Sequence, residues 1–140
     1  MNSSLMLQPA PIQVSRVPTT ERLSVLVSHF GRHTLVFESG VYVFAHQLAP
    51  SYSGGYWHFH ELSNGGFFMS PQSDPLRIQV EGNGYGGTMS AEAAGITFCL
   101  FAFSHLSFKF PDQVFMQHFY DLRAFALEHA EAGPIIAAID

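Results

Sequence analysis

The sequence predicts one α+β domain, in which a small antiparallel sheet of roughly three to four strands is packed by about four helices. An aromatic hairpin pattern at residues 55–70 and a long apolar stretch at residues 91–107 predict these two kinds of element. The chain has 140 residues, of which 47% are hydrophobic, so it can bury the core of one domain. Residues 1–17 show no periodicity, and we expect them to form a flexible N-terminal arm before a single domain at residues 18–140.

The hairpin is predicted by two aromatic runs, residues 56–60 and 67–69, that flank a turn. Asn64-Gly65 is the strongest short turn signal, because a two-residue type I′ turn needs positive φ at both positions. The facing pairs expected from this turn are Leu62 with Phe67, Glu61 with Phe68, and His60 with Met69. Because side chains alternate between faces, the two faces carry different aromatic sets, namely Tyr56, His58 and His60 on one and Trp57 and Phe59 on the other.

Residues 76–81 alternate apolar and polar side chains, which is typical of a strand with one buried face. The glycine-rich residues 82–87 follow and match the dinucleotide-binding pattern G-x-G-x-x-G, with a short strand expected at residues 88–89. A dinucleotide site also needs a second parallel strand after its helix, whereas a further helix is predicted there. We therefore interpret the glycines as a hairpin turn.

Residues 91–107 are apolar nearly all round, so we expect a buried central helix that begins at the capping residue Ser90. Cys99, the only cysteine, is expected to be an inert core residue, since burial raises a thiol pKa. Other helices are predicted at residues 19–30, 40–49 and 112–130, with a short final turn after Gly133-Pro134. The expected apolar stripe of the first consists of Leu23, Leu26, Val27 and Phe30.

The charge pattern argues against nucleic acid as a direct partner. The net charge is −5, and the six basic residues are scattered, namely Arg16, Arg22, Arg32, Arg77, Lys109 and Arg123. Tight binding to duplex DNA needs clustered cations, and a DNA mimic needs carboxylates repeated at phosphate spacing, so neither is expected. No signal peptide and no membrane span are expected, because the N-terminus lacks a basic and apolar leader pattern and residues 93–108 fall short of about 20 apolar residues. The expected location is the cytoplasm.

Candidate chemistry in the sequence is sparse. His58 and His60 lie two apart on one strand face and could present two imidazoles to a metal, but the sequence marks no third ligand. No nucleophile elbow is present, and the carboxylates do not single out an acid and base pair. We expect no enzyme activity, cofactor or metal. A small metal-dependent hydrolase using His58 and His60 and a generic protein-interaction module remain as alternatives.

Residues 52–71 resemble the hallmark segment of the ArdB/KlcA antirestriction family. Further similar pieces follow the family's order, namely residues 29–33, 82–85, 90–96 and 137–140. At the position of His60 the family more often has Tyr, which weakens the metal interpretation. The resemblance implies a protein from a plasmid or mobile element that alleviates type I restriction of incoming DNA without mimicking DNA. Its implied partner is the type I restriction enzyme or an associated host factor.

A protein without a catalytic constellation acts through a surface, and such surfaces combine an aromatic anchor with polar rim groups. The hairpin offers Trp57, Glu61 and Asn64 close together. The apolar residues before Asp140 predict a docked chain end that holds the side-chain and terminal carboxylates in place. Trp57, Glu61, Asn64 and Asp140 are therefore the candidate functional surface.

Overall fold

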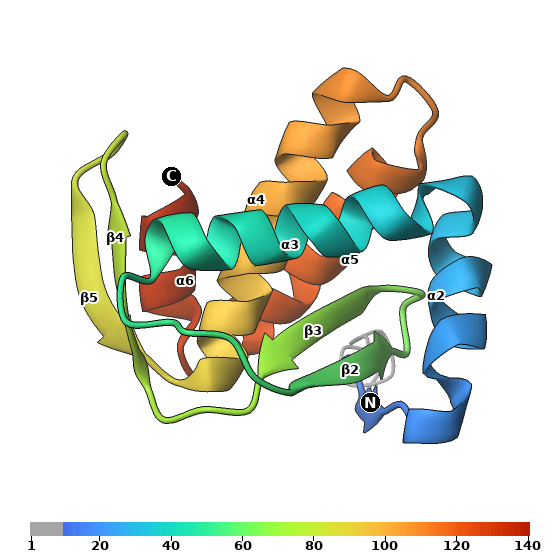
Figure 1. Cartoon of the computed structure of the whole chain (residues 1–140), viewed down its shortest axis with the longest axis horizontal. Coiled ribbons are helices and arrows are strands. Elements are labelled where there is room, and N and C mark those ends of the chain that lie inside the picture. The colour runs from blue at the N-terminus through green and yellow to red at the C-terminus, as the bar shows by residue number, and fades with distance from the viewer. Residues whose placement is uncertain (1–9) are drawn as a thin grey trace, which may run out of the picture.

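The computed structural model describes residues 10–140 and confirms the α+β class (Figure 1). Its elements are β1 (Val14–Arg16), η1 (Thr19–Glu21), α2 (Arg22–Phe30), η2 (Gly31–His33), α3 (Thr34–Leu48), β2 (Trp57–Leu62), β3 (Phe67–Pro71), β4 (Leu76–Val80), β5 (Tyr85–Met89), α4 (Ala91–Lys109), α5 (Val114–Glu128) and α6 (Ala132–Ile139). The η elements are short 3-10 helices.

The strands form two antiparallel sheets rather than one. One sheet has the order β1-β2-β3, and the other is the β4-β5 ribbon, which stands at the opposite end of the molecule (Figure 1). β1 lies within the expected flexible arm, so that expectation is wrong for residues 14–16, which pair with β2. The sequence could not predict β1, because a strand of three residues is too short to show an alternating pattern. Its backbone pairing with β2 is visible only in the structure. The expectation for residues 1–9 lies outside the described residues.

The β2–β3 hairpin turns where expected but with a different register. Phe68 faces His60, and Phe67 faces Glu61, one residue away from the predicted pairing. The backbone N–H of Leu62 donates to the carbonyl of Gly66 at 2.9 Å, so three residues form the loop instead of two. Gly65 has a φ of 93° and no other residue type has positive φ among the described residues, so the two-residue type I′ prediction is wrong.

α4 is the central helix, as predicted, and it packs against α3, α5 and β3. It begins at Ser90, whose Oγ accepts a hydrogen bond from the backbone N–H of Ala93 at 3.1 Å. Gly95 lets the helix approach β3 so closely that an added Cβ would lie 2.5 Å from the carbonyl oxygen of Met69. Cys99 is fully buried, and burial raises its pKa to about 12, which agrees with an inert thiol.

α4 is also the one helix of residues 10–140 that is long and apolar enough to cross a membrane by length and composition. Of its most apolar window, 61% is buried inside the domain. Packing in the core therefore accounts for its composition.

The remaining helices start and end differently from the sequence prediction. α2 ends at Gly31, as expected, but only Leu26 and Phe30 of its predicted stripe are buried, whereas Leu23 and Val27 are exposed. α3 begins earlier than predicted. Its first residue, Thr34, is buried and donates to the carbonyl of Gly31 at 2.7 Å. α6 starts before the Gly-Pro pair, since proline is tolerated in the first turn of a helix.

Candidate functional site

Trp57 is a core residue, although the sequence analysis placed it among the surface candidates. It is only 3% exposed, and its indole N–H donates to the hydroxyl of Tyr52 at 2.8 Å. The rings of Tyr42 and Phe98 pack against it. The Trp57 side chain points into the domain, where Tyr42 of α3 and Phe98 of α4 pack against it, so the exposed aromatic of β2 and its flank is Tyr56.

Glu61 and Asn64 both join the hairpin to a helix. The Oε2 atom of half-exposed Glu61 lies 2.7 Å from Nε2 of His29 in α2. The Asn64 side chain accepts a hydrogen bond from the N–H of Gly66 at 3.0 Å and donates to the carbonyl of Asp121 in α5 at 2.9 Å. Through these contacts both side chains stabilise the packing of the hairpin against the helices.

Asp140 is exposed at the end of α6, and its backbone N–H donates to the carbonyl of Ile136 at 3.0 Å. Ala138 is buried beside it, and its carbonyl accepts a hydrogen bond from the Asn83 side chain at 2.9 Å. The chain end is therefore docked. Within residues 10–140, no side chain is paired with the Asp140 carboxylate, which faces solvent.

His58 and His60 are not brought together with a third ligand. Their ring centroids lie 6.4 Å apart, and residues 10–140 contain no group of three His, Cys, Asp or Glu side chains able to hold a metal. His60 is buried, stacks on Phe68 at 4.4 Å and lies 3.1 Å from the Oγ atom of Ser70. Burial lowers its pKa to about 4, so it is neutral near pH 7. Ser70 is also buried, which keeps this His–Ser pair from any substrate.

Three other histidines pair with carboxylates, and each pair joins segments far apart in the sequence. The pairs, all at 2.7–2.8 Å, are His29 with Glu61, His33 with Asp112, and His129 with Glu92. The hydrogen bond from His33 holds the pKa of Asp112 below its usual range. Among residues 10–140, none of these histidines forms a hydrogen bond with a serine or cysteine side chain. Each pair therefore links two segments that are distant in the sequence and stabilises their packing.

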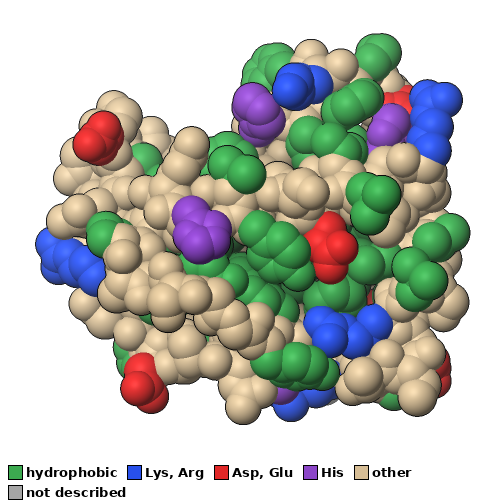
Figure 2. All heavy atoms as spheres, viewed as in Figure 1, with side chains coloured by type: hydrophobic (Ala, Val, Ile, Leu, Met, Phe, Trp, Pro, Cys, Tyr) green, Lys and Arg blue, Asp and Glu red, His purple; other side chains and the backbone are tan. Residues whose placement is uncertain are grey.

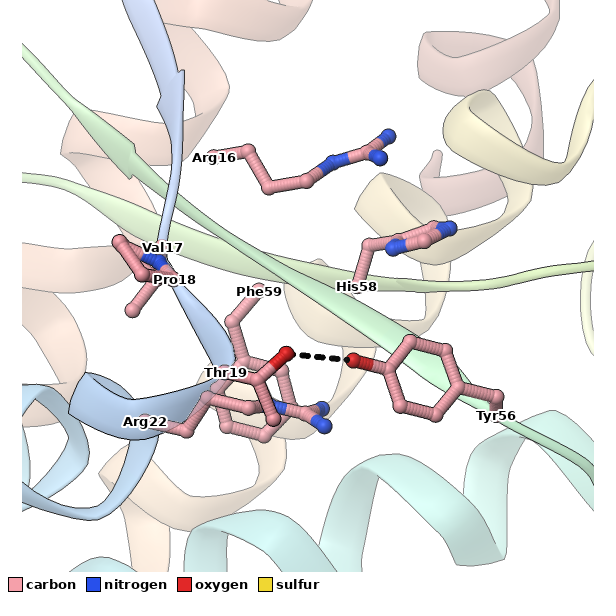
Figure 3. A pocket seen from close by; sticks show the side chains of 8 residues that line it. All are labelled: Arg16, Val17, Pro18, Thr19, Arg22, Tyr56, His58 and Phe59. Atoms are coloured by element: carbon pink, nitrogen blue, oxygen red, sulfur yellow. Dashed lines mark hydrogen bonds between the residues drawn. The ribbon is translucent and has the colours of Figure 1, made fainter.

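A cavity that the sequence analysis missed lies between the N-terminal segment and β2 (Figure 3). We call it the Arg16 pocket; it has a volume of about 390 Å³, and its lining residues are Arg16, Val17, Pro18, Thr19, Arg22, Tyr56, His58 and Phe59. The alternation that puts Tyr56 and His58 on one strand face was visible in the sequence. The approach of Arg16 and Arg22 was not, because it depends on β1 pairing with β2.

The Arg16 pocket is cationic. Two arginines and a histidine line it, and none of its described lining residues is acidic. Arg22 is fixed in place, since its Nη2 donates to the carbonyl of Trp57 at 2.7 Å and its guanidinium lies 3.8 Å from the ring centre of Phe59. Partial burial, together with the positive charges of Arg16 and Arg22, lowers the pKa of His58. The pocket therefore favours an anion.

Comparison with known proteins decides the family. A family model described as antirestriction protein matches residues 50–140. Antirestriction protein KlcA of Escherichia coli is 43% identical over 140 aligned residues, which cover 94% of this chain and 96% of the relative. The chain belongs to the antirestriction protein family. A second Escherichia coli KlcA is 37% identical and covers 95% of this chain.

The antirestriction family fold is also shared by a solved structure from work on the KlcA and ArdB proteins. It is 39% identical to this chain, has a TM-score of 0.87, and covers 95% of this chain and 98% of its own. That work describes a novel fold and antirestriction activity of KlcA and ArdB against type I DNA restriction systems in vivo but not in vitro. The family resemblance seen in the sequence is thus confirmed, and its hallmark segment at residues 52–71 is the β2–β3 hairpin with the preceding loop.

Proposed function

We propose that this protein protects incoming DNA from type I restriction in the cytoplasm, and that it does so by binding rather than by catalysis. The observation that carries the proposal is the match to the KlcA and ArdB structure, at a TM-score of 0.87 and 39% identity over 95% of the chain. Similarity at this level over a whole domain means that the two proteins share their fold. The partner is the type I restriction enzyme or a host factor associated with it.

Binding is favoured over catalysis by the placement of the reactive side chains. Cys99 and the His60–Ser70 pair are buried, and the exposed carboxylates Glu61, Asp112 and Glu92 are engaged by histidines. The alternative of a metal-dependent hydrolase is disfavoured, because residues 10–140 contain no group of three side chains that could hold a metal ion.

A mechanism based on DNA mimicry is disfavoured by the charge distribution. Figure 2 shows acidic side chains scattered singly over the visible face, with no continuous acidic stripe. Duplex DNA would instead present one charge about every 1.7 Å along its axis. The net charge of −5 is also small for a mimic of this polymer.

The revised candidate surface keeps Asp140 and, in second place, Glu61 and Asn64, while Trp57 is replaced as an exposed aromatic by Tyr56. Asp140 is the strongest member because its exposed side-chain carboxylate directly follows the docked helix α6. A negative group at a fixed position suits a basic patch on a partner protein.

The test is the plating efficiency of unmodified phage on a type I restricting strain, with and without this protein. We expect the protein to raise plating on the restricting strain and to leave plating on a restriction-deficient strain unchanged. Asp140→Ala is expected to lose most of this protection while its melting temperature stays that of the parent. Asp74→Ala removes a charge from another exposed position and serves as the matched control.

No gain in plating for the parent protein would overturn the proposed function. Full protection by Asp140→Ala would instead remove only Asp140 from the surface. A large drop in its melting temperature would assign Asp140 a structural role.

A further inference from the structure

We propose that the Arg16 pocket binds a nucleoside 5′-phosphate, in which a sugar joins a phosphate group to a planar base, either as a free nucleotide or at the 5′ end of a DNA strand. This inference goes beyond antirestriction activity and does not depend on it. It rests on the charge, the hydrogen-bond donors and the ring surface that β1, η1, α2 and β2 bring together.

The charge in the pocket runs against that of the whole protein. The chain has a net charge of −5 and only six Lys and Arg residues, yet Arg16 and Arg22 both line this one cavity. Within residues 10–140, the Arg16 side chain has no hydrogen-bond or ion-pair partner, so its five N–H donors are open to a ligand. The planar guanidinium fork matches the spacing of phosphate oxygens.

The hydrogen-bond donors line the pocket in two groups. Figure 3 shows the Arg16 guanidinium and the His58 ring extending to the same side of the strands. The Thr19 and Tyr56 hydroxyls lie 3.2 Å apart, so one hydrogen joins them and the other remains free to donate to a ligand. Arg22 adds a fixed positive charge, because its contacts with the Trp57 carbonyl and the Phe59 ring hold it in place before any ligand arrives.

A tetrahedral phosphate fits these donors better than a carboxylate does. One guanidinium already satisfies both oxygens of a carboxylate in a bidentate pair. The imidazole and the free hydroxyl hydrogen would then have no acceptor on the ligand. A phosphate group offers further oxygens to His58 and to the Thr19–Tyr56 pair, and its greater charge matches two arginines.

A ring surface lies beside the donors. Tyr56 is 46% exposed, the Arg22 guanidinium lies 4.9 Å from its ring centre, and the His58 ring meets it edge-on with centroids 5.4 Å apart. Pro18 and Val17 complete an apolar border. Stacking on an exposed aromatic ring is how proteins hold bases without reading their sequence. The volume of about 390 Å³ lies in the range of small-molecule sites.

Tight duplex binding is not implied, because two arginines engage only about one or two phosphates and release few counterions. The phosphate can still come from two sources, a free nucleotide or the phosphorylated end of a single strand. The test separates these sources.

The test is titration of the purified protein followed by nuclear magnetic resonance of its backbone amides and of the indole N–H of Trp57, the only tryptophan. The probes are AMP, adenosine, inorganic phosphate, and a short single-stranded oligonucleotide with and without a 5′-phosphate. We expect AMP to shift the signals of Arg16, Tyr56 and His58, and adenosine to bind at least roughly tenfold more weakly.

The decisive variant is Arg16→Gln, which is expected to weaken AMP binding by roughly tenfold to a hundredfold. Arg77→Gln makes the same charge change on β4, outside the pocket, and should leave binding unchanged. Tighter binding of the 5′-phosphorylated oligonucleotide than of AMP would assign the phosphate to a DNA end, and weaker binding of the oligonucleotide would assign it to the free nucleotide.

Three results would overturn the proposal. They are equal binding of AMP and adenosine, equal weakening by Arg16→Gln and Arg77→Gln, and binding of both oligonucleotides alike with no binding of AMP. Because these measurements use the purified protein alone, their failure leaves the phage plating test of antirestriction unaffected.

Discussion

The two hairpins of this protein are built alike at their turns and differently along their strands. In β2–β3 every residue of β3 is buried, whereas β4 alternates strictly between buried and exposed positions. β3 is covered by β2, α4 and α5, while the ribbon rests one face on the helices and leaves the other in solvent. The hairpin that contains the buried strand β3 contributes to the core of the domain, and the half-exposed β4–β5 ribbon closes its end.

The different burial of β3 and β4 shows when a sequence pattern is sufficient to specify the pairing of a strand. Shifting β4 by one residue would move Leu76, Ile78 and Val80 into solvent, so alternation specifies its register. A shift of β3 by one residue exchanges Phe67, Phe68 and Met69 for one another, and the whole strand is buried, so the apolar pattern specifies its register only weakly. The register of β2–β3 is set by its turn, where a three-residue loop with glycine at positive φ replaces the two-residue type I′ loop.

The largest predicted effect concerns the close contact between α4 and β3. Gly95→Ala would place a Cβ 2.5 Å from both the carbonyl oxygen of Met69 and the Cα of Ser70. Since backbone atoms cannot move aside as a side-chain tip does, we expect a loss of about 3 kcal/mol in the free energy of unfolding. Urea unfolding measures this loss.

Gly133→Ala in α6 is the matched control, because an added Cβ there meets no atom within 4 Å. It should be neutral or stabilise the protein by up to about 1 kcal/mol, since alanine favours a helix over glycine. Equal effects of the two substitutions would show that the contact between α4 and β3 is looser than described.

The next effect is a dependence of the free energy of unfolding on pH, which arises from one buried histidine on β2 and one on α5. Burial lowers the pKa values of His60 on β2 and His118 on α5 to about 4. The unfolded chain takes up these protons near pH 6.5 and the folded chain only near pH 4, so stability falls as pH drops through that window. Each histidine contributes roughly 2–3 kcal/mol to this loss. The β4–β5 ribbon contains no histidine.

His118→Phe isolates one of the two contributions. The His118 ring lies among Phe30 and Phe103, and its Nδ1 atom has no hydrogen-bond partner among the described residues. A phenyl ring keeps the packing and removes the titration, so we expect a higher melting temperature at pH 5 and a flatter pH profile. Melting temperatures measured from pH 4 to 7 that fall as steeply as in the parent would contradict this assignment.

The smallest effect compares the two turns directly. Asn64 and Asn83 each accept a hydrogen bond from the N–H two residues ahead and donate to a helix carbonyl at 2.9 Å. Asn64→Ala and Asn83→Ala should each cost roughly 1 kcal/mol, because one docking hydrogen bond and one turn hydrogen bond are lost.

The two substitutions should differ in where the structure loosens. Amide hydrogen exchange is expected to rise in α6 for Asn83→Ala, since that side chain holds the chain end. In Asn64→Ala, β3 should remain protected because it is buried on all sides. Faster exchange throughout β3 in Asn64→Ala would show that the turn, rather than burial, holds this strand.

The class, the central helix and the location of the first turn could be read from the sequence, whereas β5 begins at Tyr85, inside the predicted glycine-rich turn at residues 82–87. Continuous apolar residues around Cys99, the Ser90 cap and the alternation of residues 76–80 are local signals, and each reports directly on burial or on helix initiation. The family resemblance of residues 52–71 likewise could be read without coordinates, and with it the antirestriction function that we propose.

The tertiary structure alone decided the register of β2–β3, the burial of Trp57 and the presence of the Arg16 pocket. Each of these three features depends on which other element a strand or segment packs against, and the local sequence is compatible with more than one choice. An aromatic strand can bury either face, and Arg16 becomes part of a cavity only because β1 pairs with β2. A local sequence pattern indicates only which side of one segment is buried. A pocket forms where several segments that are distant along the chain pack together, so no local pattern predicts it.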